Sequence, residues 1–261
     1  MTKDITQQFA KIRLSKEMEF SIIVPTYQEE ACIEKCLRSI AQQDYKRSEY
    51  EIIVSDAHST DRTVEKARQF ADKVIINDQR GIAYGRNAGA QNARGDILVF
   101  IDADVTLSSD FLIQCHQVFN NPPVVGMTGI AKPSDGGIMQ RLVYRSTYCL
   151  VRIFHLFGVS LFPGICVAYR REAFKKLEGF REDFGIVEDL DLSRRISRLG
   201  ICRINKKARA FVSTRRLEKH LLSTVIFHVY SDIKYLLTGK ASKYYPKVEE
   251  VNSWKDLWQN H

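Results

Sequence analysis

The sequence predicts an α/β fold with a mostly parallel sheet flanked by helices, followed by a C-terminal helical extension. Short apolar, β-branched runs alternate with segments of helical spacing from about residue 20 to residue 104, which is the pattern of consecutive βαβ units. Apolar residues make up 44% of the 261 residues. That share is enough for a sizeable hydrophobic core and argues against global disorder.

Four largely apolar runs are the expected strands, and they span residues 20–25, 51–55, 73–76 and 97–101. Continuous apolar runs suit strands that are buried on both faces of a parallel sheet. Helical spacing predicts helices over residues 29–43, from residue 59 onward, and over residues 81–93. Beyond residue 105 the alternation weakens: we expect a helix over 110–119 and a loop-rich stretch over 122–136.

Two apolar segments follow in the second half of the chain. The first, residues 148–167, contains Arg152, His155 and Pro163, which argues against a helix that spans a membrane. A buried helix and an interfacial segment in contact with a membrane both remain open for it. The second, residues 221–237, is predicted to be an amphipathic helix with basic flanks.

The formal net charge is +8, and most of it lies near the C-terminus. Residues 203–247 hold eleven Lys and Arg against two acids, an excess of +9, so the rest of the chain sums to −1. This excess predicts an anionic partner such as lipid headgroups, a phosphorylated acceptor or nucleic acid, with a solvated basic surface as the alternative. We expect a catalytic domain over 19–216, with halves at 19–104 and 105–216, and a basic helical tail over 217–261.

The segments directly after the four expected strands are residues 25–29, 56–59, 78–80 and 102–104. Ligands of parallel sheets bind at the carboxyl ends of the strands. Asp102 and Asp104 flank one small residue, so in an extended chain both carboxylates point the same way. Two such carboxylates repel each other unless a cation lies between them. They therefore predict a Mg²⁺ or Mn²⁺ site, because both ions prefer oxygen ligands.

Five motifs occur in a fixed order: Val-Pro-Thr-Tyr-Gln-Glu at 24–29, Val-Ser-Asp at 54–56 with the residues to 63, Arg-Asn-Ala-Gly at 86–89, Asp-Ala-Asp at 102–104, and Val-Glu-Asp-Leu-Asp-Leu at 187–192. In this order they resemble family 2 glycosyltransferases of the GT-A fold, over about residues 19–200. The resemblance implies a metal-dependent, inverting transfer of a sugar from a UDP or GDP sugar. The sequence holds no QxxRW motif, which favours transfer of a single sugar over processive synthesis.

The resemblance also implies the residues that bind the donor. Pro25, Tyr27 and Glu29 look like the first nucleotide-binding loop, where Tyr27 would stack on the base and Glu29 would hydrogen-bond to it. Asp56 is similar to an aspartate that accepts a hydrogen bond from the base. Arg80 is placed near the base or phosphate by a looser match.

The remaining implied roles concern the reaction itself. Asp102 would contact ribose or metal, and Asp104 would be the direct metal ligand, so that the metal neutralises the diphosphate leaving group. Asp189 matches the position of the catalytic base, and Glu188 beside it would orient the acceptor or raise the basicity of Asp189. The acidic first turn of an ordinary helix is the alternative interpretation of residues 188–191.

The acceptor is expected to be lipid-linked or a polyprenyl-phosphate at the membrane surface. The basic region and the two apolar segments motivate this expectation. Arg215 and Arg216 are adjacent and suit phosphate oxygens of the donor or of such a lipid, although an ordinary basic turn has the same sequence. If the acceptor is a phosphate, it is already anionic and Asp189 need not act as a base.

Two other classes of protein fit part of the sequence. A nucleic-acid-binding α/β protein fits the pI near 9.1, but the basic region has no recognisable nucleic-acid-binding motif, and no nucleic-acid partner is expected. A nucleotidyltransferase also pairs carboxylates with a metal, but a glycine-rich phosphate loop is expected where residues 25–29 stand. The six cysteines form no CxxC pair, so we expect reduced thiols in a cytoplasmic protein, with peripheral attachment to the inner face of the membrane as the sharper hypothesis.

Overall fold

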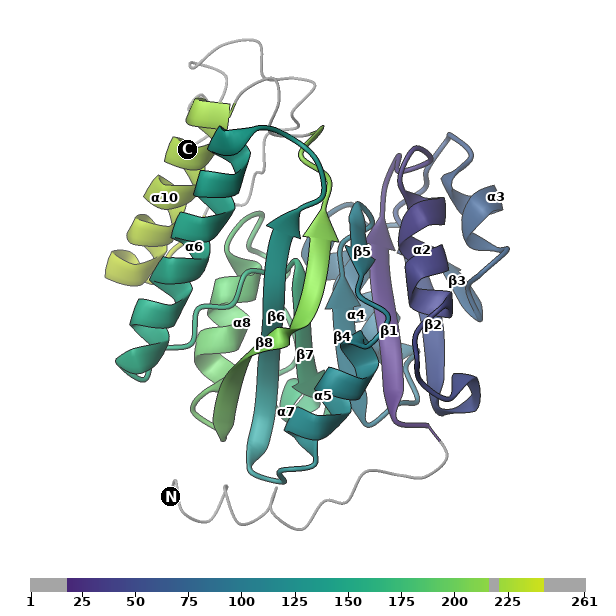
Figure 1. Cartoon of the computed structure of the whole chain (residues 1–261), viewed down its shortest axis with the longest axis horizontal. Helices are drawn as coiled ribbons and strands as arrows, with labels where there is room; N and C mark the ends of the chain where they lie inside the picture. The colour runs from purple at the N-terminus through teal and green to yellow at the C-terminus, as the bar shows by residue number, and fades with distance from the viewer. Residues whose placement is uncertain (1–17, 216–220, 242–261) are drawn as a thin grey trace.

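The computed structural model describes residues 18–215 and 221–241. One eight-stranded sheet runs through the described chain in the order β3-β2-β1-β4-β7-β6-β8-β5, with helices against both of its faces (Figure 1). This arrangement confirms the predicted α/β class with a mostly parallel sheet. Within the described ranges, no helix is long and apolar enough to cross a membrane.

The first half of the sheet is built from four parallel strands. These are β1 (Phe20–Thr26), β2 (Tyr50–Asp56), β3 (Lys73–Ile76) and β4 (Ile97–Ile101). The connecting helices are α2 (Ile33–Ala41), the 3₁₀ turn η1 (Arg47–Glu49), α3 (Thr63–Ala67) and α4 (Ile82–Gln91). All four strands lie where the apolar runs predicted them.

The second half mixes strand directions, because β7 is antiparallel to both β4 and β6 while β8 is parallel to β6. Its elements are β5 (Val105–Leu107), α5 (Phe111–Phe119), β6 (Val124–Pro133), α6 (Ile138–Leu156), β7 (Cys166–Arg170), α7 (Arg171–Lys176), α8 (Glu188–Ile196), β8 (Ile201–Val212) and α10 (Leu221–Thr238). Helix α10 confirms that a helix forms over the predicted residues 221–237.

One expectation for this half is wrong, and one of the two alternatives for residues 148–167 does not hold. Residues 122–136 are not loop-rich but hold the ten-residue strand β6. Gly129 on this strand allows close packing, since a Cβ there would lie 2.6 Å from the carbonyl oxygen of Ala208 on β8. Residues 148–167 are not one helix: α6 ends at Leu156, Gly158 follows with φ of +78°, and β7 begins at Cys166. Helix α6 is also not a buried helix, because Val151 is its only buried residue.

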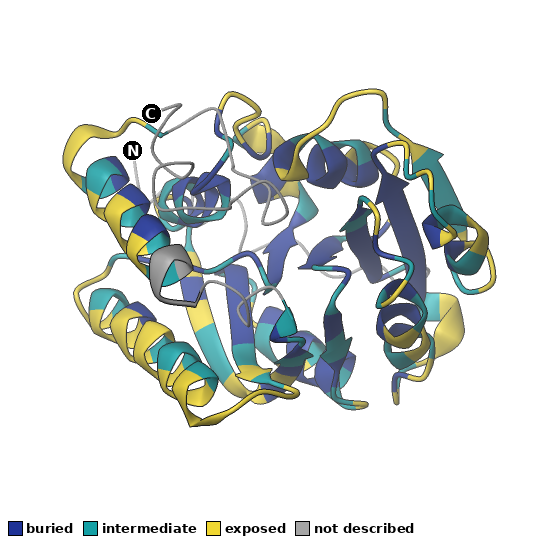
Figure 2. Cartoon of the chain, turned by 90° about the horizontal axis from the view of Figure 1, so that it is seen from above, coloured by how far each residue is buried: buried dark blue, intermediate teal, exposed yellow. Residues whose placement is uncertain are grey.

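Side chains alternate across the strands and form a core on each face of the sheet. On β1, Ile22 and Val24 pack with α2 and α5, whereas Ile23 packs with α4, α7 and α8 on the opposite face. Figure 2 shows the buried strands in dark blue beneath helices whose outward sides are yellow. All six cysteines are free thiols; four are buried and Cys149 is exposed.

The entry into β4 passes very close to the start of β1. A Cβ at Gly95 would lie 2.5 Å from the carbonyl carbon of Phe20 and from the amide nitrogen of Ser21. The Gly95 N–H also donates a hydrogen bond of 2.8 Å to the Ser21 hydroxyl. Because these neighbours are backbone atoms, they have little freedom to move aside.

We therefore expect Gly95→Ala to lower the free energy of unfolding by about 1–3 kcal/mol, the usual cost of forcing extra volume into a packed site. Urea denaturation measures the change. Gly137→Ala is the matched control, because its nearest atom is the flexible Gln140 side chain at 3.4 Å, and it should alter stability by less than about 0.5 kcal/mol. Equal stability of the two variants would contradict the close approach at Gly95.

Candidate active site

Asp56 joins the loops that follow β1 and β2. It is fully buried, and its carboxylate accepts hydrogen bonds from the Thr26 hydroxyl (2.9 Å), the Ser59 amide (2.7 Å) and the Ser59 hydroxyl (2.6 Å). These bonds use three of its roughly four acceptor positions. These hydrogen bonds therefore fix the orientation of the buried Asp56 carboxylate at the bottom of the site. Its contact with a nucleotide base stays a prediction.

The outer part of the site is formed by side chains from the first three strand-end loops. The Arg80 guanidinium lies over the Tyr27 ring at 4.9 Å, a cation–π contact between the first and third loops. His58 Nε2 lies 2.8 Å from Asp78 Oδ1 and joins the second loop to the third. The structure therefore brings Tyr27 and Arg80 together, as a shared nucleotide subsite requires.

The first loop is also tied to the chain that follows β8. Glu29 is buried and forms an ion pair with Arg215, and its amide donates a hydrogen bond of 2.8 Å to Thr63 Oγ1. Pro25, at the end of β1, packs 3.1 Å from the Cβ position of Gly85. The structure thus places Arg215 at the nucleotide loop. Arg216 lies outside the described residues.

At the centre of the site is Arg86, a fully buried arginine of helix α4. Its Nη2 lies 2.9 Å from Asp102 Oδ1 and its Nη1 lies 2.8 Å from Glu188 Oε1. Nη2 also donates a 3.1 Å hydrogen bond to the Gly164 carbonyl. One guanidinium therefore holds the acidic triplet after β4, the loop before β7 and the start of α8 in one place.

Sequence reasoning assigned no role to Arg86, although its surroundings carried a signal. It stands in a helix of small residues whose Ala83 and Ala90 are buried, so an arginine on that face must find buried acids. Its neighbour Asn87 exchanges hydrogen bonds with the backbone of Phe180, at 2.9 and 3.0 Å. The 86–89 motif thus fixes the segment leading into α8.

Helix α8 begins at the two acids predicted to act in the reaction. Val187 precedes them with φ of +65°, a strained conformation for a β-branched residue that is found mainly at functional sites. The Asp189 carboxylate accepts hydrogen bonds from the amides of Gly164 and Leu190. The backbone thereby fixes the direction of this carboxylate.

Burial changes the proton affinity of both acids. Burial, together with the neighbouring Asp189 carboxylate, raises the pKa of Glu188 to about 8, although Arg86 acts in the opposite direction. Burial also raises the pKa of Asp189, opposed by Arg86 and by its two amide donors. A raised pKa brings a carboxylate closer to the range in which it accepts a proton at neutral pH.

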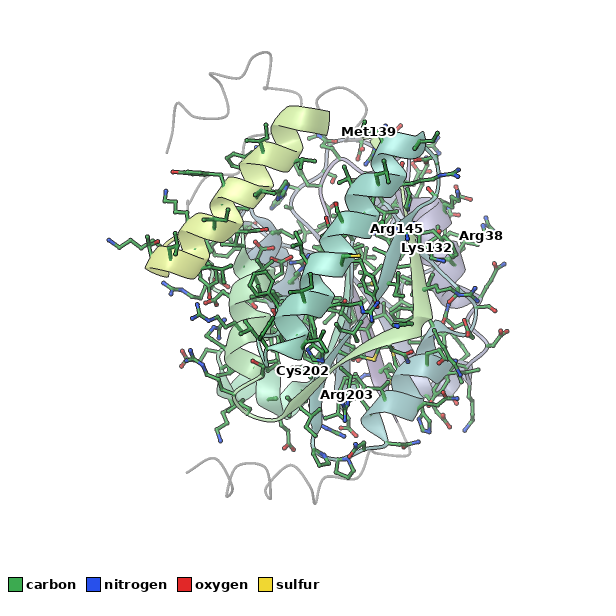
Figure 3. The ribbon with its side chains drawn as sticks, turned by 60° about the vertical axis from the view of Figure 1, so that its left-hand side comes forward. Arg38, Lys132, Met139, Arg145, Cys202 and Arg203 are labelled. Atoms are coloured by element: carbon green, nitrogen blue, oxygen red, sulfur yellow. The ribbon has the colours of Figure 1, made fainter. Side chains whose placement is uncertain are left out.

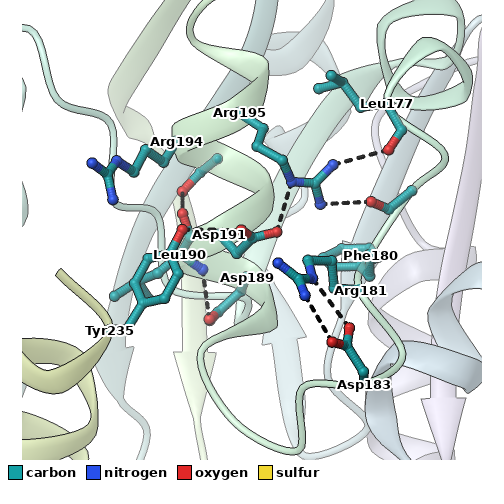
Figure 4. Close-up of polar contacts among 12 residues, drawn as sticks. Leu177, Phe180, Arg181, Asp183, Asp189, Leu190, Asp191, Arg194, Arg195 and Tyr235 are labelled. Atoms are coloured by element: carbon teal, nitrogen blue, oxygen red, sulfur yellow. Dashed lines mark hydrogen bonds and ion pairs between the residues drawn. The ribbon is translucent and has the colours of Figure 1, made fainter. Parts of the chain in front are cut away.

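Helix α10 covers one side of α8. The Tyr235 hydroxyl donates a 3.0 Å hydrogen bond to Asp191 Oδ1, while Arg195 Nε lies 2.7 Å from Asp191 Oδ2 (Figure 4). Burial, and secondarily the charge of Asp189, raises the pKa of Asp232 on α10 to about 7. The acidic start of α8 is therefore more than a solvated helix turn, since it is paired and covered.

The acidic triplet suits a divalent cation held jointly with a substrate. Asp102 and Asp104 would offer carboxylate oxygens after β4, and Arg86 balances part of the Asp102 charge. In residues 18–215 and 221–241, no group of three or more His, Cys, Asp or Glu side chains could hold a metal. Diphosphate oxygens and water would complete the coordination, which is how Mg²⁺ is usually held.

A family model described as Glycosyl transferase family 2 matches residues 21–178, more than half of the chain. The chain belongs to glycosyltransferase family 2. The matched region holds four of the five motifs together with Arg86 and Gly164, whereas the acids of α8 lie just beyond it.

Named relatives of this family 2 chain differ in their acceptors. A Methanococcus voltae dolichyl N-acetyl-alpha-D-glucosaminyl phosphate 3-beta-D-2,3-diacetamido-2,3-dideoxy-beta-D-glucuronosyltransferase is 34% identical over 166 residues, which cover 59% of this chain and 49% of that protein. The Staphylococcus aureus poly(ribitol-phosphate) beta-N-acetylglucosaminyltransferase TarS is 33% identical over 101 residues, which cover 36% of this chain and 18% of TarS. The chain thus spans half or less of these relatives.

Solved structures share the fold. The mannosyltransferase PcManGT from Pyrobaculum calidifontis, in complex with GDP-Man and Mn²⁺, superposes with a TM-score of 0.70 at 24% identity, covering 94% of this chain and 74% of that one. TarS 1–349 from S. aureus with UDP-GlcNAc gives 0.59 at 21% identity, covering 83% and 67%. These likenesses confirm the predicted GT-A fold.

The raised pKa values predict how stability depends on pH. Because folding raises the pKa of Asp232 to about 7, the folded protein keeps a proton that the unfolded chain has released, so stability falls as pH rises from about 4 to 7. Urea denaturation at several pH values measures this slope. Asp232→Asn should make the slope shallower, whereas Asp183→Asn, an exposed control, should leave it unchanged. If Asp232→Asn leaves the pH dependence of stability unchanged, Asp232 does not have a raised pKa in the folded protein.

Arg86→Lys should destabilise the protein by about 2 kcal/mol or more. A lysine has one point of charge and cannot bridge two carboxylates and a carbonyl, so a buried acid loses its partner. Chemical denaturation tests this change against Arg62→Lys, whose ion pair with Glu65 is exposed on both sides and whose replacement should leave stability unaltered. Tolerance of lysine at position 86 would refute the bridging role.

Proposed function

We propose that the chain is a metal-dependent, inverting glycosyltransferase that moves one sugar from a UDP or GDP sugar to an acceptor. One observation carries the proposal: buried Arg86 joins Asp102 of the acidic triplet to Glu188, the neighbour of Asp189. Groups suited to the donor and a group suited to the acceptor are thus fixed in one site. The GDP-Man and UDP-GlcNAc bound to the two fold neighbours are donors of this class.

On the donor side, Tyr27 and Arg80 bind the nucleotide at the rim, and Asp56 fixes the floor beneath it. Asp104 would be the direct ligand of Mg²⁺ or Mn²⁺. Asp102, which pairs with Arg86, would contact the ribose or the metal. A bound cation would supply positive charge to balance the diphosphate leaving group. Arg215 adds a positive charge beside the first loop.

On the acceptor side, Asp189 takes the proton from an acceptor hydroxyl as the oxygen attacks the anomeric carbon. Attack opposite the leaving diphosphate inverts that carbon. The amides of Gly164 and Leu190 aim the carboxylate, and its raised pKa favours proton uptake. Glu188, held by Arg86, sets the position of the turn from which Asp189 projects.

The acceptor is lipid-linked or a polyprenyl-phosphate at the inner surface of the membrane. The basic excess over residues 203–247 supports an anionic acceptor. The names of the two relatives describe acceptors that carry phosphate, one linked to dolichol and one a ribitol-phosphate polymer.

A panel of nucleotide sugars with Mn²⁺ or Mg²⁺ tests the donor half of this function. We expect one UDP or GDP sugar to raise the thermal unfolding temperature only when the metal is present, and to release nucleotide slowly. Asp104→Asn should abolish the metal-dependent shift. If no nucleotide sugar shifts the temperature with either metal, the proposal fails.

Asp189→Asn separates the two kinds of acceptor. With a hydroxyl acceptor, loss of the base should lower kcat by about 10²–10⁴-fold while donor binding persists. With a phosphate acceptor, which is already anionic, most activity should remain. Asp183→Asn, whose partner is the exposed Arg181, is the control for removing one carboxylate. Loss of donor binding in Asp189→Asn would place Asp189 outside the acceptor role.

A further inference from the structure

We propose that helices α6 and α10 form a docking surface for an anionic lipid bilayer. This inference deepens the proposed function and rests on it for the acceptor that the membrane would present. The two helices lie side by side at one end of the sheet (Figures 1 and 3). We call their outward surface the α6–α10 face.

The α6–α10 face is unusually apolar for an exposed surface. On α6, Ile138 and Leu156 are 78% and 82% exposed, and Phe157 directly after it is 81% exposed. On α10, Leu237 is 81% exposed. Further aliphatic side chains lie exposed between them on both helices. Exposed apolar side chains gathered on two neighbouring helices favour a surface that contacts a partner or a membrane.

The charges on α6 are arranged beside this apolar stripe. Arg141, Arg145 and Arg152 are all exposed, and at about 100° per residue they fall within about 40° of one another around the helix axis. From Gly136 to Arg171 the sequence contains no Asp or Glu, and no described carboxylate pairs with the three arginines. Figure 3 shows Arg145 and Met139 on α6.

This combination suits lipid better than a protein partner. An apolar helix face flanked by unbalanced arginines lies in the interface of a bilayer, where the apolar side chains enter the acyl boundary and the arginines extend to anionic headgroups. Each basic residue near such a surface strengthens binding several-fold. A second protein chain would need a matching row of acids to balance the same arginines.

The α6–α10 face is linked to the candidate active site through contacts already described. Tyr235 of α10 holds Asp191 of α8, two residues from Asp189. Behind α6 lies a pocket lined by Tyr144, Tyr148 and Ile165, among others, and the Ile165 carbonyl accepts a 3.4 Å hydrogen bond from the Asp102 amide. A membrane docked on this face therefore lies against the elements that border the acceptor side.

Sedimentation of the full chain with vesicles tests the surface. At low salt we expect binding to vesicles of phosphatidylcholine with 30% phosphatidylglycerol and weak binding to phosphatidylcholine alone. Replacing Arg141, Arg145 and Arg152 together by Gln should lower the partition coefficient about a hundredfold. The matched control replaces the exposed Lys35, Arg68 and Lys175 by Gln, removing the same charge elsewhere, and should change partition only slightly.

A second variant tests the apolar half of the surface: Leu156→Ser with Phe157→Ser should weaken binding at least tenfold. Nucleotide-sugar binding is measured in the same preparations as a check on folding. If the wild-type chain binds the donor but no vesicles, the docking surface is overturned and the proposed function stands. If it binds vesicles but no donor, the docking surface stands and the proposed function fails. A wild-type dimer that these Ser substitutions convert to a monomer would assign the face to a second copy and also overturn the proposal.

Discussion

The buried guanidinium of Arg86 is the interaction on which the arrangement of the site depends. A charge in that position is costly unless it is paired, and its partners come from three separate parts of the chain: Asp102, Gly164 and Glu188. Any packing of the second half of the sheet that failed to bring them together would leave at least one buried charge without a partner. The ion-pair network thus selects one mutual position of the two halves.

The sheet supplies the frame for this network. Antiparallel pairing of β4 with β7 sets Ile101 opposite Cys166, so the loop before β7 runs alongside the acidic triplet. Helix α4 approaches β1 closely because Gly85 and Gly89 have no side chains, and a Cβ at Gly89 would lie 2.4 Å from Ile23 Cγ2. That close approach carries Arg86 inward to the level of the strand ends.

The first half of the fold was predictable because its information is local. Each parallel strand is an apolar run buried on both faces, and the expected bounds of 73–76 and 97–101 match β3 and β4. The second half depends on pairings between distant segments, so the stretch expected to be loop-rich over 122–136 contains strand β6. The acids at 102, 104, 188 and 189 were proposed from their place in the order of motifs, and their roles stay predictions. The role of Arg86 was not found, because it depends on partners up to 102 residues away.

Gly164 is the point at which the two sides of the site meet. Its carbonyl binds Arg86, its amide binds Asp189, and a Cβ there would lie 2.4 Å from Arg86 Nη2. The position therefore admits a single amino acid for steric reasons alone, whatever sugar or acceptor the protein handles. Across chains that share this arrangement of arginine and acids, position 164 should vary less than residues that select the substrate, because even alanine would displace the guanidinium.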